Sequence, residues 1–223
     1  MDDLAITDAR LVTALADLRR VGRFLGGEAA SLAALGEAIP AGAPARVLDV
    51  GTGSADFAEA VVRWGVRTGR DVRAEGVDLN PATLAVASQW LDRSMAPAER
   101  PRVTLRQADV LALPYADGAF DVAHAGLFLH HFDARSAPRV LAEMGRVARV
   151  VVVNDLHRHA LAYHAIRLIA RWSRSEMFRH DAPVSVRRGF TGAELDAAVA
   201  DAGLVGARRW RWAFRWLVVA HHP

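Results

Sequence analysis

The chain has 223 residues, of which 52% are hydrophobic and 24% charged, so it can form one large core and is not expected to be disordered. It has no cysteine, which excludes disulfides, thiolate nucleophiles and cysteine metal clusters. The formal net charge is only +3, and the sequence pI is about 10.4 because all 28 basic residues are arginine. No leader-like segment and no apolar run of the ~18 residues of a membrane helix is found, so we expect a cytoplasmic protein with no membrane partner.

The first 40 residues are expected to form a helical cap beside a main domain at residues 41–223. Leucines recur at helical spacing until two glycines at residues 26–27 end the run. A second helix is expected over residues 28–39, before a short linker rich in proline and glycine. The cap therefore consists of at least two helices.

Residues 46–57 (RVLDVGTGSADF) read as a buried strand, a glycine turn and the start of a helix, which is the cofactor cradle of doubly wound α/β folds. Gly51 and Gly53 let the backbone turn sharply and approach a ligand closely. Asp49 before the turn and Asp56 after it would repel a pyrophosphate and favour a ligand with positive charge. S-adenosylmethionine carries a sulfonium and an ammonium group and no phosphate, so the turn favours this cofactor over NAD.

The rest of the chain alternates strands and helices, which predicts a doubly wound, Rossmann-like α/β sheet with helices on both faces. Four further strands are expected, at residues 72–78, 103–106, 120–125 and 147–153. Asn80 and Pro81 suit the start of the helix after the second strand, and Thr191 and Glu194 form a capping box for a later helix. Residues 155–188 are expected to form a helical insertion.

Two final strands, at about residues 205–212 and 214–220, are expected to form a hairpin that completes seven strands with an antiparallel C-terminal strand. Residues 208–216 (RRWRWAFRW) interleave aromatic rings and arginines, a pattern also found on nucleic-acid-binding surfaces. Period-two alternation is the simpler explanation, with the aromatic residues on one face of the hairpin and the arginines on the other. We therefore expect no nucleic-acid partner.

Several segments together resemble class I S-adenosylmethionine-dependent methyltransferases, in particular quinone-biosynthesis-like and natural-product O-methyltransferases. These segments are residues 47–55 (VLDVGTGSA), 76–81 (GVDLNP), 107–114 (QADVLALP), 120–124 (FDVAH) and 129–132 (LHHF). The resemblance is firm over residues 44–154 and looser at both ends. Ala55 departs from it, since many members have a third glycine there, but alanine is small enough to keep the assignment.

The resemblance implies which residues meet the cofactor. Asp78 ends the second strand, where a carboxylate can accept hydrogen bonds from both ribose hydroxyls. Leu79 would pack against the adenine and Asp109 would accept from its amino group, with a simple turn carboxylate as the alternative for Asp109. Asp56 also suits a first helical turn, and His124 also suits a packing histidine. The predicted cofactor residues are Asp49, Gly51, Thr52, Gly53, Asp56, Asp78, Leu79, Asp109, Val110, His124 and Ala125.

Methylation of a hydroxyl requires removal of its proton, to which a general base contributes about 10²- to 10⁴-fold, and histidine suits neutral pH. In the resembling sugar and polyketide O-methyltransferases, paired histidines and the acidic residue after the fifth strand act near the acceptor hydroxyl. His130, His131 and Asp155 match those positions, and His157 is the next candidate. Adjacent side chains are not expected to both point inward, so one histidine of the pair should be structural.

In the resembling family the N-terminal segment often covers the substrate. Arg20, Arg23 and Phe24 of the cap are therefore candidates for substrate contacts, with packing or solvent exposure as the simpler alternative. His164 and His180 of the insertion either line the substrate pocket or face solvent.

We therefore predict a methyltransferase that acts on a hydroxyl of a small aromatic, quinol or polyketide-like acceptor. Asn154 and Asp155 resemble part of the divalent-metal site of catechol-type methyltransferases, but His124 replaces the companion acidic residue, so no metal is predicted. An RNA or DNA methyltransferase is the alternative, although cysteine and an Asn/Asp-Pro-Pro-aromatic run after the fourth strand are both missing. A non-catalytic cofactor-binding scaffold is a third hypothesis, and a homodimer stays open.

Overall fold

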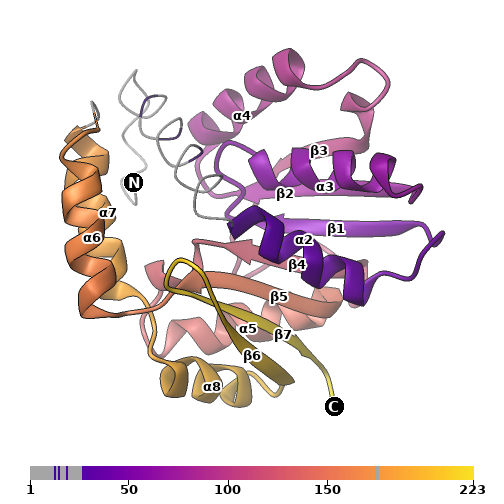
Figure 1. Ribbon diagram of the computed structural model, residues 1–223. Coiled ribbons are helices and arrows are strands. Elements are labelled where there is room, and N and C mark those ends of the chain that lie inside the picture. Colours follow the sequence, from indigo (N-terminus) through magenta and orange to yellow (C-terminus); the bar gives the residue numbers. More distant parts are fainter. Residues whose placement is uncertain (1–12, 14, 16–18, 20–26, 174–175) are drawn as a thin grey trace.

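A computed structural model describes residues 13, 15, 19, 27–173 and 176–223. Its centre is a seven-stranded sheet in the order β3-β2-β1-β4-β5-β7-β6, with helices on both faces (Figure 1). The strands are β1 (Ala45–Val50), β2 (Val72–Asp78), β3 (Val103–Gln107), β4 (Phe120–Gly126), β5 (Ala148–Leu156), β6 (Val205–Arg211) and β7 (Arg215–His221). The pairs among β1 to β5 are parallel, and β7 is antiparallel to both β5 and β6, which confirms the predicted fold class.

Helices and short 3-10 turns connect the strands. They are α2 (Gly27–Ala38), α3 (Asp56–Arg67), α4 (Pro81–Ser94), η1 (Arg100–Arg102), η2 (Leu129–His131), α5 (Ser136–Val147), α6 (Ala160–Ala170), α7 (Glu176–Arg188) and α8 (Gly192–Asp201). One apolar core lies between the sheet and α5 and α8, and a second lies between the sheet and α2, α3 and α4. The central strands are buried on both faces, which explains their continuous apolar sequences.

The predicted helix starts are confirmed. Asn80 caps α4 by accepting a hydrogen bond from the backbone N–H of Ala82 at 2.9 Å, and Pro81 takes the first helical position. Both halves of the capping box at α8 form, with the Thr191 hydroxyl 3.3 Å from the Glu194 backbone nitrogen and the Glu194 carboxylate 2.8 Å from the Thr191 nitrogen.

The fifth strand is longer than the sequence suggested. The ladder with β7 pairs Asp155 with Trp216 and Leu156 with Arg215, so β5 continues to Leu156. Asn154 and Asp155 therefore lie inside the strand and not in the loop after it. Since successive side chains of a strand point to opposite faces, the side chains of these two residues lie on opposite faces of the sheet.

The closing hairpin forms, but its faces are less regular than predicted. Trp210 and Trp216 oppose each other in register, as the alternation predicts. The prediction that the arginines lie on the other face is wrong for Arg208, because its guanidinium carbon lies 4.2 Å from the Trp216 ring centroid. Trp212 and Phe214 lie in the turn between the strands.

The cap and the insertion flank the sheet. Helix α2 confirms the second helix of the predicted cap. Of the first predicted helix only residues 13, 15 and 19 are described, and Arg20, Arg23 and Phe24 lie outside the described residues. The insertion forms α6 and α7, which lie side by side beyond one end of the sheet (Figure 1). No helix in the described ranges is both long enough and apolar enough to cross a bilayer.

Candidate functional site

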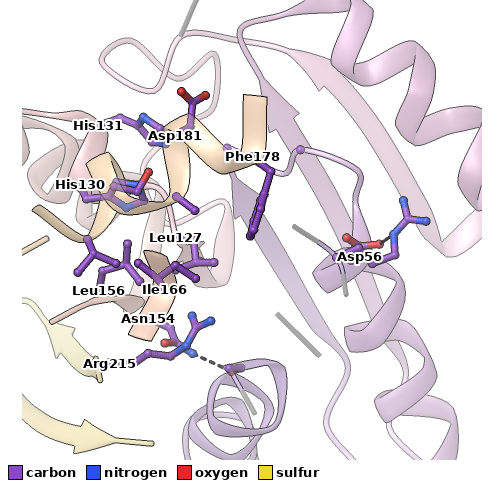
Figure 2. A pocket seen from close by; sticks show the side chains of 18 of the residues that line it. Asp56, Leu127, His130, His131, Asn154, Leu156, Ile166, Phe178, Asp181 and Arg215 are labelled. Carbon is purple, nitrogen blue, oxygen red and sulfur yellow. Dashed lines mark hydrogen bonds and ion pairs between the residues drawn. The ribbon is translucent and has the colours of Figure 1, made fainter. Parts of the chain in front are cut away.

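A cavity of about 570 Å³ opens where the parallel strands β1, β4 and β5 end. It is lined by the glycine turn after β1, by η2, by α2, α6 and α7, and by the start of β7 (Figure 2). This is the edge at which open α/β sheets bind their ligands, and the volume suits a small molecule.

The glycine turn has the backbone that its sequence predicts. Gly51 and Gly53 have φ values of +64° and +54°, in the left-handed region that glycine occupies without strain. A Cβ at Gly51 would lie 2.1 Å from Cδ2 of Phe128, so this position admits no side chain. The N–H of Thr52 donates to the carbonyl of Val77 at 2.9 Å, which ties the turn to β2.

Ala55, where many relatives carry glycine, also has a left-handed backbone, with φ 59° and ψ 26°. Its methyl group is fully buried. Replacing Ala55 by glycine loses about 1 kcal/mol of methyl burial but relieves about 1–2 kcal/mol of backbone strain, so the free energy of unfolding should hardly change. Ala58→Gly, at an equally buried position inside α3, should instead cost about 2 kcal/mol. Urea unfolding of the two variants measures this difference, and equal losses would contradict the strain at Ala55.

Asp49, at the end of β1, is 3% exposed and belongs to a buried network. Its carboxylate accepts from the Thr52 hydroxyl at 2.6 Å and lies 2.9 Å from Nδ1 of His124. The other ring nitrogen of His124 lies 3.0 Å from the Ser31 hydroxyl of α2, and the ring stacks on Phe57 at 3.6 Å. Both nitrogens of His124 are thus engaged, and the residue orients Asp49 and connects α2 to the sheet.

Asp56, in the first turn of α3, is also engaged. It accepts from the Ser54 hydroxyl at 2.7 Å and forms an ion pair with Arg19 at 2.5 Å. The Arg19 guanidinium carbon lies 3.5 Å from the Trp90 ring centroid. The expectation that Asp56 gives the glycine turn a free negative charge is therefore wrong, because Arg19 neutralises it. The preference of the turn for a cationic ligand then depends on Asp49 and Asp78.

Asp78 lies next to the glycine turn, at the end of β2. Its carboxylate accepts from the backbone nitrogens of Gly53 at 3.2 Å and Asn80 at 3.0 Å. Burial raises the pKa of Asp78, and these backbone hydrogen bonds offset only part of the rise. The residue thus holds the second strand against the turn at the position predicted for the ribose.

Asp78 and the other residues predicted for the nucleoside lie outside the cavity lining. Leu79 is 48% exposed. Asp109 is exposed and accepts from the backbone N–H of Leu111 at 2.9 Å, which is the turn role proposed as its alternative. Val110 and Ala125 are buried in the core between the sheet and α5. Their contact with a cofactor stays a prediction.

His130 and Asp155 form a buried polar pair at the site. Nδ1 of His130 lies 2.7 Å from one carboxylate oxygen of Asp155, and the backbone N–H of His130 donates to the other at 3.0 Å. Asp155 has no exposed surface, and its first oxygen also accepts from the Leu156 N–H at 2.6 Å. Burial favours the neutral acid, but the pairing with His130 and these hydrogen bonds outweigh it and lower the pKa of Asp155.

An ionised Asp155 can only accept hydrogen bonds, so Nδ1 of His130 carries the proton. The remaining nitrogen, Nε2, is then the basic atom of the ring. His130 lines the cavity, whereas Asp155 lies behind it. This arrangement fixes the orientation of the His130 ring at the wall of the cavity.

His131 also lines the cavity, and its ring centroid lies 4.4 Å from that of His130. The expectation that only one of the adjacent histidines faces inward is therefore wrong. The 3-10 turn η2 is the reason, because its three residues per turn place successive side chains about 120° apart and not on opposite sides.

The other histidines considered as site residues do not all line the cavity. His157 lies outside the cavity lining, with its ring 4.5 Å from that of Trp216. Burial and the nearby charges of His159 and Arg208 lower the pKa of His157. His180 lines the cavity, whereas His164 lines a smaller pocket between α6 and α7.

Sequence reasoning missed Ser31 and Arg215, and it considered Asn154 only as part of a resemblance to a metal site. Ser31 bonds to His124 and also accepts from the Asn154 side chain at 3.0 Å, and Asn154 donates to the Gly27 carbonyl at 2.7 Å. A lone serine in an otherwise apolar helical stretch was the available signal. Arg215 is only 3% exposed and lines the cavity, although the alternation had placed it among the surface arginines. The described residues contain no cluster of three or more His, Asp or Glu side chains that could hold a metal.

Comparison with known proteins agrees with this architecture. A family model described as a methyltransferase domain matches residues 47–150. The 27-O-demethylrifamycin SV methyltransferase of Amycolatopsis mediterranei is 34% identical over 115 residues, covering 49% of this chain and 39% of the relative. The demethylmenaquinone methyltransferase of Thermus thermophilus is 38% identical over 112 residues, covering 47% and 46%. The matches thus span less than half of the relatives' own length.

Solved structures extend the similarity of the fold to most of the chain. A SAM-dependent methyltransferase from Aquifex aeolicus superposes with a TM-score of 0.62 at 16% identity, covering 85% of this chain and 88% of its own. Magnesium protoporphyrin IX methyltransferase from Synechocystis, solved with bound S-adenosylhomocysteine, gives 0.64 at 14% identity, covering 92% and 85%. Residues 47–150 therefore match a methyltransferase domain and are similar to quinone and natural-product methyltransferases, and most of the chain shares the fold of S-adenosylmethionine-dependent methyltransferases.

Proposed function

We propose that this chain transfers a methyl group from S-adenosylmethionine to a hydroxyl of a small aromatic, quinol or polyketide-like acceptor, with His130 as the general base. The observation that carries the proposal is the buried His130–Asp155 pair at the wall of a cavity that also reaches the glycine turn. When bound, the cofactor supplies a methyl group activated by its sulfonium.

The residues around the turn fit this cofactor. Gly51 and Gly53 give a backbone that a ligand can approach closely. Asp49 offers a buried carboxylate for the ammonium group of the methionine end, and Asp78 offers one for the ribose hydroxyls. The chain's own contribution at this end is binding and orientation.

The chemistry at the acceptor end is proton removal. Nε2 of His130 takes the proton of the acceptor hydroxyl and so makes its oxygen nucleophilic. Asp155 keeps Nδ1–H in place and stabilises the imidazolium that results. His131, whose ring is tilted against that of His130 in the cavity wall, is expected to shape the acceptor site.

Similarity to relatives supports the acceptor class. The names of two of them refer to an O-demethylated rifamycin and to a demethylated menaquinone. Leu156, Ile166 and Phe178 give the cavity apolar walls suited to such ring systems. Figure 2 shows these side chains and the two histidines around the same pocket.

The first test is calorimetric titration with S-adenosylhomocysteine, followed by measurement of its release from S-adenosylmethionine with phenol, quinol and polyketide acceptors. We expect micromolar to sub-millimolar binding and turnover with at least one acceptor. No binding below about millimolar concentration would contradict the proposal, and so would binding with methyl transfer only to carbon or nitrogen. A salt-sensitive gel shift with mixed RNA would support the nucleic-acid alternative.

A further inference from the structure

Arg215 is a buried cation that the mechanism above does not use. It begins β7, opposite Leu156 of β5, and only 3% of the residue is exposed. Its Nε atom is buried without a hydrogen-bond partner, and no ion pair within 4.0 Å joins its guanidinium to any side chain of the described ranges. Asp155 acts on its charge only from beyond that distance, and burial lowers the pKa of Arg215.

The chain holds this cation in one place. A Cβ on Gly27 would lie 2.9 Å from Cζ of Arg215, so the absence of a side chain there lets the guanidinium pack against the start of α2. Figure 2 shows the Arg215 side chain beside Asn154, which is itself bonded to Gly27 and Ser31. A buried charge without a partner destabilises a protein. Since Arg215 has no partner among the residues that the structure describes, its position at a cavity wall points to a ligand that completes the pair.

We propose that Arg215 binds a carboxylate of the methyl acceptor, so that the preferred substrates are hydroxy acids with an aromatic or otherwise apolar body. This inference rests on the proposed function. A guanidinium presents a planar fork of N–H donors that matches a carboxylate with two parallel hydrogen bonds. The apolar side chains of Leu156, Ile166 and Phe214 line the same cavity and suit the uncharged part of such an acid.

S-adenosylmethionine also has a carboxylate that could bind Arg215, but the order of the strands favours a carboxylate of the acceptor. From β1, which carries the glycine turn, the order runs through β4 and β5 to β7. Arg215 therefore starts three strands away from that turn, or about 14 Å at the usual strand spacing. It starts on the strand next to β5, which carries Asp155 and thereby positions His130.

The test uses the protein saturated with S-adenosylhomocysteine and three pairs of probes, the ortho, meta and para hydroxybenzoic acids and their neutral hydroxybenzamides. Calorimetry should show at least one acid binding about tenfold or more tighter than its amide. Arg215→Gln should remove that preference and leave S-adenosylhomocysteine affinity within about threefold, and Arg215→Lys should restore part of it. Arg209→Gln, an exposed arginine of the same hairpin paired with Glu37, is the matched control and should change neither affinity.

Gly27→Ala tests the geometry without removing the charge. The new methyl group would displace the guanidinium, so this variant should also weaken the acid relative to the amide. Thermal unfolding of Arg215→Gln without ligand should occur at the same or a higher temperature, because the variant removes an unpaired buried charge. A structural arginine would give a clear decrease instead.

The outcomes separate the two proposals. Equal binding of acid and amide by the native protein in every pair, including no binding of either, would overturn the assignment of Arg215. So would loss of S-adenosylhomocysteine affinity in Arg215→Gln with the acid preference intact, because Arg215 would then hold the cofactor's own carboxylate. Failure of the native protein to bind S-adenosylhomocysteine would instead overturn the proposed function.

Discussion

Replacing His130 by glutamine should lower kcat by about 10²- to 10⁴-fold and leave the affinity for S-adenosylmethionine unchanged. The imidazole is only 4% exposed and is fixed by Asp155, so another base could not easily take its position. Steady-state turnover with a phenolic or quinol acceptor, together with calorimetric cofactor binding, measures both quantities. The matched control is His164→Gln, a histidine that lines the smaller pocket and should change neither.

The Asp155→Asn variant tests the same pair by changing the buried partner of His130. Asparagine keeps the shape but not the charge, so kcat should fall by about 10- to 100-fold while His130 remains in place. Because the pKa of Asp155 is lower in the folded protein than its ordinary value of 3.8, the ionised carboxylate stabilises the fold at pH values above 3.8. This stabilisation is lost as the pH falls through the pKa of the folded state. Acid unfolding of the variant should therefore lack this component. Full activity in both variants would remove His130 from the mechanism and favour a non-catalytic scaffold.

Gly51→Ala should cost about 3 kcal/mol or more in the free energy of unfolding and should abolish cofactor binding. The new methyl group meets the Phe128 ring at 2.1 Å, and φ is +64°, so steric overlap and backbone strain act together. Gly53→Ala is the matched control, because its φ is similar at +54° but the nearest side-chain atom, on Leu15, is 3.8 Å away. Backbone strain alone should cost the control about 1–2 kcal/mol.

Urea unfolding and calorimetric titration with S-adenosylhomocysteine compare these two glycine variants. A similar loss of stability in both would show that the contact with Phe128 does not determine the choice of glycine. Normal cofactor binding by Gly51→Ala would contradict the position of the turn in the cofactor site.

Local signals made much of this molecule predictable. The glycine turn, the Asn80–Pro81 helix start and the Thr191–Glu194 capping box each depend on residues a few positions apart, and all three form as expected. The parallel order of the strands alone predicts that the site lies at the edge of the sheet where the strands end.

Contacts between distant segments could not be predicted from such signals. Arg19 compensates Asp56, and Ser31 of α2 completes the network of His124, only after the N-terminal segment packs on the sheet. Arg215 is buried because α2 covers the end of the hairpin, although its sequence neighbours resemble an exposed strand. Periodicity gives the face of a strand but not the partner that covers that face.

The length of β5 gives the C-terminal hairpin a part in the site. Asn154 anchors α2 on one side of the sheet and Asp155 holds His130 on the other, so a slip of one residue would exchange the two. The alignment of both is fixed by β7, which pairs with β5 from Val151 to Leu156. Strand β7 thus sets the register that places Asp155 behind His130, the proposed base, so a change in the C-terminal hairpin can displace that residue.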